Sequence, residues 1–413
     1  MGRPIALRCI SCRTEYGPVE LNYHCPTCGP RRGTLEVLYD YDELRRRLHR
    51  DAFRASGRSS MWRYLPLLPV EDERWIQPLR VGWTPTYAFD ELASDLGLAK
   101  LYVKDDGQNP TASYKDRASS IVVIKAQEKR RPVVTCASTG NAASSLAGFA
   151  ASTDLDAIIF VPKRAPEAKV AQLLVYGARV FLVDGSYDTA YDLAAEAAAA
   201  FGWYNRSAAI NPYLVEGKKT GALELAEQLD WEPPDVVFVG VGDGSVISGI
   251  CKGFEELHAL GLIEHAPRVI GVQAEGSAPI AAAFDRFDGT TVEIEDIEAE
   301  TVADSICVGA PRDIVKAVTY VHRNGGGFVT VSDGEILSAI AELARRTGVF
   351  AEPAGAASYA GLRRLADEGK LKDATAAIIV SGNGLKDTAS ARKAVTGEAI
   401  AIRPSLGELE RHL

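Results

Sequence analysis

Short runs of extended or apolar residues alternate with longer helical patterns through most of the chain. The runs that predict strands lie at 101–104, 133–136, 157–161, 179–183, 235–240 and 376–380. The stretches between them predict helices at about 115–129, 141–151, 166–177, 187–201 and 246–260. Strands and helices that alternate at this spacing are typical of βαβ units. We therefore expect an α/β fold with parallel sheets covered by helices on both faces.

Polar loops follow three of the predicted strands. In parallel sheets, ligands bind beyond the carboxyl ends of the strands. The loop 138–141 opens a helix, and its amide and hydroxyl groups could hold a carboxylate, although an ordinary capped turn has the same composition. The turn 242–245 can close its backbone N–H groups around a phosphate. Because Ser245 stands where the dinucleotide fingerprint needs glycine, a smaller cofactor fits better. Ser381 adds a hydroxyl group at the same sheet edge.

Lys115 begins the predicted helix 115–129, after the break in regular structure at 109–110. Thr111 and Ser113, which precede it, are residue types that cap helix N-termini. The positive end of a helix dipole disfavours an ammonium group, so we expect the pKa of Lys115 to be lowered. A lysine of this kind suits a Schiff base with a carbonyl cofactor. A solvated lysine in a first helical turn is the alternative that this stretch alone leaves open.

Four cysteines near the N-terminus form two Cys-x-x-Cys pairs with twelve residues between them: Cys9, Cys12, Cys25 and Cys28. Four thiolates in this pattern are typical of a structural zinc site with no open coordination position. Iron or two disulfides are the alternatives, and disulfides are rare in reducing compartments. Gly29 is expected to relieve the turn after the second pair. Together with a strand predicted at 34–39, the pairs indicate a zinc ribbon.

Composition and charge narrow the classes of function. The chain has 413 residues, enough for two domains, and its 46% hydrophobic and 24% charged residues are ordinary for a globular protein. The net charge is -9, yet residues 1–63 carry twelve arginines against seven carboxylates, which leaves the remainder at -14. An acidic body argues against a nucleic-acid enzyme. No apolar segment predicts secretion or a membrane span, so a cytoplasmic protein is expected.

A connector is expected between the ribbon and the body. The basic stretch 41–50 predicts a short helix. A solvated helix face that tethers the ribbon is the favoured interpretation, and nucleic-acid binding is the alternative. The proline-rich stretch 62–79 is expected to be irregular.

An amine at a helix start, a carboxylate-binding loop, a phosphate-binding turn and a hydroxyl group at one sheet edge are the groups that pyridoxal phosphate requires. In this combination the chain resembles the threonine synthases, which are pyridoxal-phosphate enzymes of fold type II. The resemblance runs from about Val81 to Asp387 through seven ordered motifs: Asn109–Arg117, Ser138–Asn141, Asn211–Pro212, Glu216–Thr220, Glu275–Pro279, Glu352–Ala354 and Gly382–Asp387. A similar cysteine ribbon precedes the domain in some members of the family.

The resemblance implies a role for each candidate residue. Lys115 corresponds to the catalytic lysine that forms the Schiff base and moves protons. Asn141 corresponds to the partner of the cofactor's 3′-oxygen, and Ser138 and Thr139 to the loop that binds the substrate's carboxylate. Ser381 corresponds to a neutral hydroxyl group that faces the pyridine nitrogen, which suits elimination and replacement better than transamination. The phosphate cup corresponds to Gly242, Asp243, Gly244 and Ser245.

The chain departs from the family at positions expected to bind the substrate's phosphate. The family usually has serine and arginine where this chain has Ala209 and Leu214, so a bidentate arginine contact is missing there. Asp243 also places a carboxylate in the phosphate cup. Lys218, where the family usually has glutamine, and Arg312 are candidate compensating cations.

The same resemblance implies the domain organisation. A zinc ribbon at 1–40 and a connector at 41–80 precede a two-domain body. The large cofactor-binding domain is expected to combine 81–117 with 216–400, and a small α/β domain to occupy 118–215. A homodimer is also expected.

The leading interpretation is a lyase that converts O-phosphohomoserine and water to threonine and phosphate. In that reaction Lys115 takes the α-proton, a β-proton leaves, phosphate departs from Cγ and water adds at Cβ. The alternative, motivated by Leu214, is a β-elimination or β-replacement enzyme that acts on a non-phosphorylated amino acid, as serine and threonine ammonia-lyases do. A zinc-ribbon binding protein with a vestigial lyase body is a third interpretation, and the intact set around Lys115 argues against it.

Overall fold

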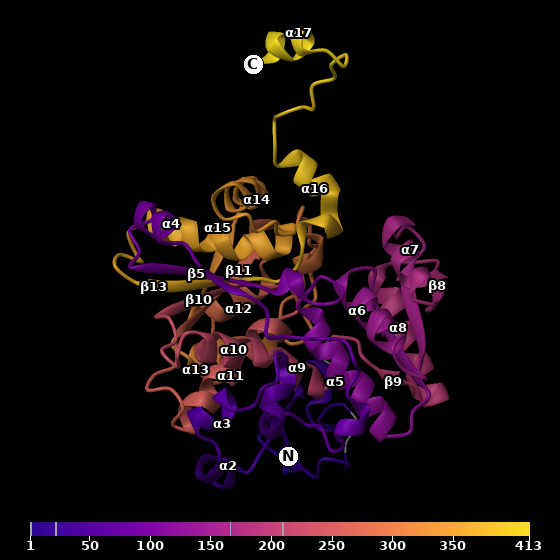
Figure 1. The fold of residues 1–413 in the computed structure, drawn as a ribbon. Coiled ribbons are helices and arrows are strands. Elements are labelled where there is room, and N and C mark those ends of the chain that lie inside the picture. Colours follow the sequence, from indigo (N-terminus) through magenta and orange to yellow (C-terminus); the bar gives the residue numbers. More distant parts are fainter. Residues whose placement is uncertain (1, 21–22, 166, 209) are drawn as a thin grey trace.

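The computed structural model describes residues 2–20, 23–165, 167–208 and 210–413, and Figure 1 shows their arrangement. A six-stranded and a four-stranded sheet, each covered by helices, form the body of the molecule. A small three-stranded sheet near the N-terminus packs against this body. The predicted fold class, an α/β fold with parallel sheets preceded by a small ribbon, is confirmed.

The N-terminal ribbon is an antiparallel sheet in the order β2-β1-β3, built from β1 (Ala6–Cys9), β2 (Glu15–Tyr16) and β3 (Leu35–Leu38). The short helix α1 (Gly29–Arg32) follows the last cysteine, and Gly29 adopts a φ of 72°, which glycine tolerates without strain. Leu7, Leu35 and Val37 are fully buried in the same apolar core as the helices of the body. The ribbon is therefore continuous with the main core.

The basic stretch after the ribbon differs from its prediction. Two helices, α2 (Tyr41–Arg47) and α3 (Arg50–Arg54), replace the single helix expected at 41–50. They are separated because Leu48 takes an extended conformation that buries its side chain, which ends the first helix. Arg45 and Arg50 donate to the backbone oxygens of Ala259 and Leu262 in the body, as a tethering segment should. The connector is likewise less irregular than expected, since it contains the 3-10 helices η1 (Met61–Leu67) and η2 (Glu73–Trp75).

The six-stranded sheet has the order β12-β11-β10-β13-β5-β4 and is parallel except for the edge pair β4–β5. Its strands are β4 (Thr86–Ala88), β5 (Lys100–Asp105), β10 (Val236–Gly240), β11 (Arg268–Ala274), β12 (Gly327–Val331) and β13 (Thr375–Val380). The central strand β10 is buried along its whole length, which explains its unbroken apolar sequence.

Helices cover both faces of this sheet, as Figure 1 shows. Val237 and Val239 of β10 point to one face, and Val236 and Phe238 point to the other. The first face packs against α9 (Tyr213–Lys218), α10 (Thr220–Gln228), α11 (Ser245–Ala259), α12 (Pro279–Asp285) and α13 (Ile314–Arg323). The second face packs against α4 (Asp90–Asp95), α14 (Asp333–Thr347) and α15 (Pro353–Asp367).

The four-stranded sheet is parallel throughout and has the order β8-β7-β6-β9. Its strands are β6 (Val133–Ala137), β7 (Asp156–Pro162), β8 (Arg179–Val183) and β9 (Tyr204–Asn205). One face packs against α8 (Tyr187–Phe201), and the other against α5 (Lys115–Glu128), α6 (Asn141–Ala150) and α7 (Glu167–Val175). All four strands come from between residues 118 and 215, while the domain boundaries themselves stay a prediction.

A buried ion network fixes α5 against the large sheet. Arg117 is fully buried and donates to Asp106 (2.6 Å) and Glu224 (2.5 Å), and Lys104 lies 2.9 Å from Glu224. Burial alone would raise the pKa of Glu224, but Arg117 and Lys104 lower it to about 2. Because Arg117 lies two residues after Lys115, the network holds the start of α5 in one position.

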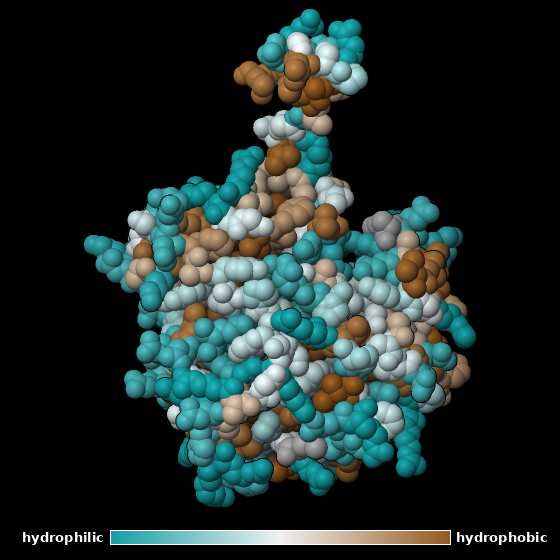
Figure 2. Space-filling view, viewed as in Figure 1, coloured by the Kyte–Doolittle hydropathy of each residue, from teal (hydrophilic) through white to brown (hydrophobic). Residues whose placement is uncertain are grey.

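The C-terminal segment leaves the body after α16 (Thr388–Lys393) and ends in α17 (Leu406–Leu409) and a 3-10 turn, η7 (Glu410–His412). Figures 1 and 2 show it projecting away from the body, with apolar side chains on its surface. Four short 3-10 turns complete the elements: η3 (Asp106–Gln108), η4 (Glu275–Ser277), η5 (Asp304–Ile306) and η6 (Gly384–Asp387). No helix in the described part of the chain is long and apolar enough to cross a membrane.

Candidate active site

A cavity of about 770 Å³ lies between the two large sheets. Its walls are the loops that follow the carboxyl ends of β6, β8, β9, β10 and β13, together with the start of α5 and the segment 296–312. Every residue that the sequence singled out for cofactor or substrate lines this cavity: Lys115, Ser138, Thr139, Asn141, Gly242, Asp243, Gly244, Ser245 and Ser381. The structure brings the predicted set together, while the role of each residue stays a prediction.

Lys115 is the first residue of α5 and faces the cavity. Burial lowers the pKa of its ammonium group, the nearby Glu352 carboxylate opposes the change and Arg206 reinforces it. The expected caps are absent, because the N-cap residue is Tyr114 and it makes no side-chain bond to the helix. Thr111 instead donates its backbone N–H to Asp116 (2.6 Å) and its hydroxyl group to the same carboxylate. The first N–H groups of this helix are instead bonded to the preceding backbone, since Asp116 donates to the oxygen of Ser113 and Arg117 to that of Tyr114, each at 3.3 Å.

The loop after β6 leads directly into α6, which begins at Asn141. Ser138 and Thr139 are partly exposed to the cavity, and the hydroxyl group of Ser138 accepts the N–H of Gly140 (3.2 Å). The amide of Asn141 donates to both carboxylate oxygens of Glu352, at 2.8 and 3.0 Å. This bond orients Asn141 across the gap between the two sheets, because Glu352 lies at the start of α15.

The turn after β10 has the conformation of a phosphate cup. Gly244 adopts a φ of 90°, and a side chain at Gly242 would place its Cβ 2.9 Å from the Cα of Ile306, so both positions need glycine. Ser245 then begins α11, and the first residues of this helix, Ser245, Val246 and Ile247, line the cavity. Burial raises the pKa of Asp243, whose carboxylate accepts the backbone N–H of Arg312 (3.2 Å). The carboxylate therefore has its own partner outside the cup.

Ser381 follows β13 and places its side chain on the cavity wall. Its backbone oxygen accepts the N–H of Tyr114 at 2.8 Å, so the loop after β13 and the residue before Lys115 are fixed to each other. A neutral hydroxyl group thus stands at the carboxyl edge of the large sheet, as the sequence predicted.

The cations of the cavity differ from expectation. Leu214 is fully buried in the apolar core, and Ala209 lies outside the described residues. Arg312 is engaged by Asp188 (2.7 Å) and stacks on the ring of Tyr191. Lys218 lines the cavity and donates to the hydroxyl group of Ser245 at 2.7 Å.

Two residues of this cavity region, Arg206 and Glu352, were not predicted as site residues from the sequence. Arg206 lines the cavity and is only 1% exposed, and it follows β9, a strand too short to be recognised from an apolar pattern. Glu352 is buried and bonded to Asn141, and it belongs to the family motif Glu352–Ala354, for which the sequence predicted no role. A signal existed for the second residue, since a glutamate before a proline at a helix start is well placed to face a ligand loop.

The cavity has the groups that pyridoxal phosphate requires. Lys115 offers an amine of lowered pKa, the turn 242–245 offers backbone donors for a phosphate, and Asn141 and Ser381 offer polar contacts to a ring. The close fit of Gly242 and Gly244 leaves no room for side chains in the cup. These residues therefore fit the cofactor that the sequence predicted.

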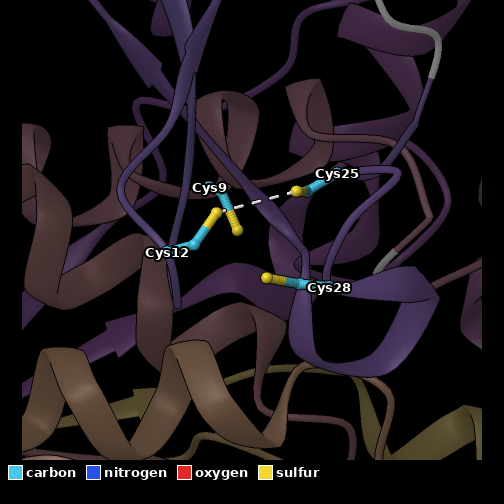
Figure 3. A group of neighbouring side chains, drawn as sticks. All are labelled: Cys9, Cys12, Cys25 and Cys28. Carbon is cyan, nitrogen blue, oxygen red and sulfur yellow. Dashed lines mark hydrogen bonds between the residues drawn. The ribbon is translucent and has the colours of Figure 1, made fainter.

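The four N-terminal cysteines form a second site, which Figure 3 shows. Their sulfur atoms lie within 4.8 Å of one another, and the Sγ atoms of Cys12 and Cys25 are 3.8 Å apart. Four sulfurs each about 2.3 Å from a shared ion at the centre of a tetrahedron would be about 3.8 Å apart. The donor set and its spacing fit a structural zinc ion.

Comparison with known proteins identifies relatives over nearly the whole chain. Residues 78–382 match the family described as "Pyridoxal-phosphate dependent enzyme". The threonine synthase of Methanocaldococcus jannaschii is 40% identical over 98% of this chain and 98% of its own. That of Methanosarcina acetivorans is 39% identical over 92% of both chains. Among solved structures, a processed threonine deaminase from Solanum lycopersicum has a TM-score of 0.67 at 23% identity and covers 92% of this chain and 98% of its own, which is a likeness of fold.

Proposed function

Because the chain belongs to the pyridoxal-phosphate-dependent enzymes, and within them to the threonine synthases, we propose that it converts O-phosphohomoserine and water to threonine and phosphate. The observation that carries this proposal is the cavity itself, where the amine of Lys115, the turn 242–245 and two buried cations share one space. A reaction with two phosphate groups, one on the cofactor and one on the substrate, needs such a set.

Pyridoxal phosphate, when bound, supplies an electron-withdrawing ring that acidifies the α-hydrogen of an amino acid. Lys115 would hold the cofactor and carry the α-proton on its Nζ atom, and its lowered pKa keeps part of this amine neutral. The N–H groups of the turn 242–245 would bind the cofactor's phosphate. Asn141 and Ser381 would orient the ring.

The loop 138–141 would bind the substrate's carboxylate. Ser138 and Thr139 present hydroxyl groups at the start of α6, where backbone N–H groups are free and the helix dipole favours an anion. In the net reaction the Cγ–O bond breaks, phosphate leaves with the bonding electrons, and water supplies the hydroxyl group at Cβ.

We further propose that Cys9, Cys12, Cys25 and Cys28 hold one structural zinc ion. The four sulfur atoms and their spacing support it. Because thiolate ligands persist in reducing compartments, this site also supports a cytoplasmic location.

We also propose that the protein is a homodimer in which the C-terminal segment packs on the second copy. Leu406 and Leu413 are 78% and 96% exposed on a segment that projects from the body. Exposed apolar side chains of this kind mark interaction surfaces. Sedimentation of the full chain should give a dimer, and removal of residues 396–413 should shift it toward the monomer. A full-length monomer at all concentrations would contradict the proposal.

The experiment that tests the proposed function follows phosphate and threonine release from O-phosphohomoserine by the cofactor-loaded enzyme. Lys115→Ala should abolish both products and the visible absorbance of the bound cofactor, while Lys129→Ala, at the other end of α5, should retain both. Serine and threonine should give no keto acid. If the enzyme releases keto acid from serine or threonine and no phosphate from O-phosphohomoserine, the proposal is replaced by an ammonia-lyase activity. The structural reason to consider that activity is Leu214, which is buried and offers no phosphate contact.

A further inference from the structure

Arg206 lies buried in the cavity and forms no ion pair within the described part of the chain. It follows β9 and is 1% exposed, and its Nε atom donates to the hydroxyl group of Ser119 at 3.2 Å. Its Nη2 atom has no hydrogen-bond partner among the described residues, and no described carboxylate forms an ion pair with it. A buried guanidinium group in this state is destabilising unless a ligand satisfies it. Its presence in the cavity wall therefore points to an anion.

A second buried cation lies beside it. Lys218 donates to the hydroxyl group of Ser245, which is both the last residue of the phosphate cup and the first residue of α11. Burial lowers the pKa of Lys218 far below its usual value, and the charges of Arg206 and Lys115 lower it further. The side chains of Arg206, Lys218 and Lys115 all line the same cavity.

Neighbouring carboxylates do not neutralise these cations. Asp243 accepts the backbone N–H of Arg312, and Asp313 lies 3.3 Å from Lys316. A further cation of the region, Arg312, pairs with Asp188. Arg206 and Lys218 thus remain for an anion of more than one charge.

The cup 242–245 and the Arg206 side chain occupy different walls of the cavity. The cup belongs to the large sheet, and Arg206 follows the edge strand β9 of the small sheet. Backbone N–H groups in the cup suffice for the cofactor's phosphate. The planar fork of Arg206 suits the bidentate recognition of a second phosphate.

We propose that Arg206, assisted by Lys218, binds the phosphate group of the amino-acid substrate and stabilises it as it leaves. This inference rests on the proposed function, and it assigns the substrate's phosphate to Arg206, after β9 of the small sheet, and to Lys218, in α9 against the large sheet, while Leu214 packs in the core. When the Cγ–O bond breaks, the bonding electrons remain on the phosphate, and the two cations meet the added negative charge.

The test uses the cofactor-loaded enzyme and the variants Arg206→Gln, Arg206→Lys and Lys218→Gln. Arg179→Gln is the matched control, since Arg179 is an exposed arginine on β8 of the same sheet. For Arg206→Gln we expect kcat/KM for O-phosphohomoserine to fall on the order of 100-fold. Binding of inorganic phosphate, measured by calorimetry, should weaken in parallel. Arg206→Lys should retain part of the kcat/KM and part of the phosphate affinity because it keeps the positive charge. It should not restore either value fully, because lysine lacks the planar guanidinium group.

Two further measurements separate the possible anions. Titration with the cofactor, followed by its visible absorbance, should give the same affinity in the wild type and in Arg206→Gln. The affinity for threonine, which has the carboxylate but no phosphate, should also be unchanged. Weaker cofactor binding would assign Arg206 to the cofactor's phosphate, weaker threonine binding would assign it to the carboxylate, and either result would overturn the proposal.

The experiments distinguish a failure of the proposed function from a failure of the role proposed for Arg206. If the wild type releases no phosphate from O-phosphohomoserine, that function fails, and calorimetry with inorganic phosphate still decides whether Arg206 binds an anion. If the wild type is active and Arg206→Gln has an unchanged kcat/KM, the function stands and this inference is wrong. Should Arg206→Gln fail to fold, as judged by circular dichroism, Arg206→Lys decides between the same results.

Discussion

Arg31 of the ribbon forms a bidentate ion pair with Asp296 in the wall of the candidate active site, with N–O distances of 2.8 and 2.7 Å. Arg31 lies in α1, three residues after the last cysteine of the proposed metal site. The neighbouring Arg32 donates to the backbone oxygen of Val292 at 3.1 Å. The metal site and the cavity wall are therefore joined by one short helix.

For Arg31→Ala we expect a small change in stability and a larger change in substrate binding. Asp296 is 49% exposed, and exposed ion pairs contribute about 0–1 kcal/mol, so the free energy of unfolding should fall by no more than about 1 kcal/mol. The segment 292–299 should become more susceptible to proteolysis, and KM should rise while kcat changes little. Arg46→Ala, an exposed arginine of α2 with no ion pair in the described part of the chain, is the control.

For Cys25→Ser we expect the loss of bound metal and of stability. Cys25 is fully buried, and its sulfur belongs to the cluster of four. Metal analysis should give one zinc ion per chain in the wild type and less in the variant, and the unfolding temperature should fall. Cys307→Ser, at a half-buried cysteine far from the cluster in sequence, should leave the metal content unchanged. If the wild-type protein contains no zinc after expression in zinc-containing medium, the proposed site is refuted.

Asp116 should make stability depend on pH in a defined window. Burial raises the pKa of Asp116 from 3.8 to about 6, so the folded protein keeps this proton at pH values where the unfolded chain releases it. Its contribution to the free energy of unfolding is therefore fully present below about pH 4 and declines by roughly 3 kcal/mol as the pH rises to 6.

The measurement compares urea unfolding of the wild type and Asp116→Asn between pH 4 and 8. The difference in unfolding free energy between them should change below pH 6 and be constant above it. Asp156→Asn, at an exposed position at the start of β7, should show no such pH-dependent difference in that window. A constant difference for Asp116→Asn across the whole range would show that the carboxyl group is not shifted.

Glu352 should control the pH at which Lys115 captures the cofactor. Burial lowers the pKa of Lys115, and the charge of Glu352 raises it again in part. In Glu352→Gln the pKa of Lys115 should therefore be lower than in the wild type, and more of the amine should be neutral at a given acidic pH.

The readout is the rate at which the cofactor-free enzyme gains visible absorbance after pyridoxal phosphate is added, as a function of pH. The acid limb of this profile should move to lower pH in Glu352→Gln. Glu275→Gln, which removes a surface ion pair with Arg364, should leave the profile in place. A shift to higher pH would mean that Glu352 acts on Lys115 in some other way.

Much of the fold follows from local patterns. Strands such as β10 and β13 are buried on both faces, so their sequences are almost entirely apolar and their limits were predicted within one residue. The start of α5 at Lys115 was also predicted correctly, because Asn109–Pro110 interrupts the chain before it. The α/β class is confirmed by the structure, and the family is confirmed by the comparison with known proteins.

Other features depend on contacts that local patterns do not contain. The break between α2 and α3 arises because Leu48 turns into the core, and a basic helical pattern does not reveal this. Arg206 enters the cavity because β9 pairs with β6 for only two residues, a length that no periodicity reveals. The bond between Asn141 and Glu352 joins residues 211 positions apart. These residues meet only when the two sheets pack together.

The contacts of the ribbon also bear on how the chain folds during its synthesis. Its partners Asp296 and Arg323 lie 265 and 287 positions after Arg31 and Glu36. At a translation rate of about 5–20 residues per second, the ribbon waits roughly 10–60 s on the ribosome before the surface that receives it exists. Through this interval the ribbon lacks both of these ion pairs, and a metal ion held by four thiolates would help to keep the segment ordered. The supply of zinc to the nascent chain would then limit the yield of folded enzyme, independently of how stable the finished protein is.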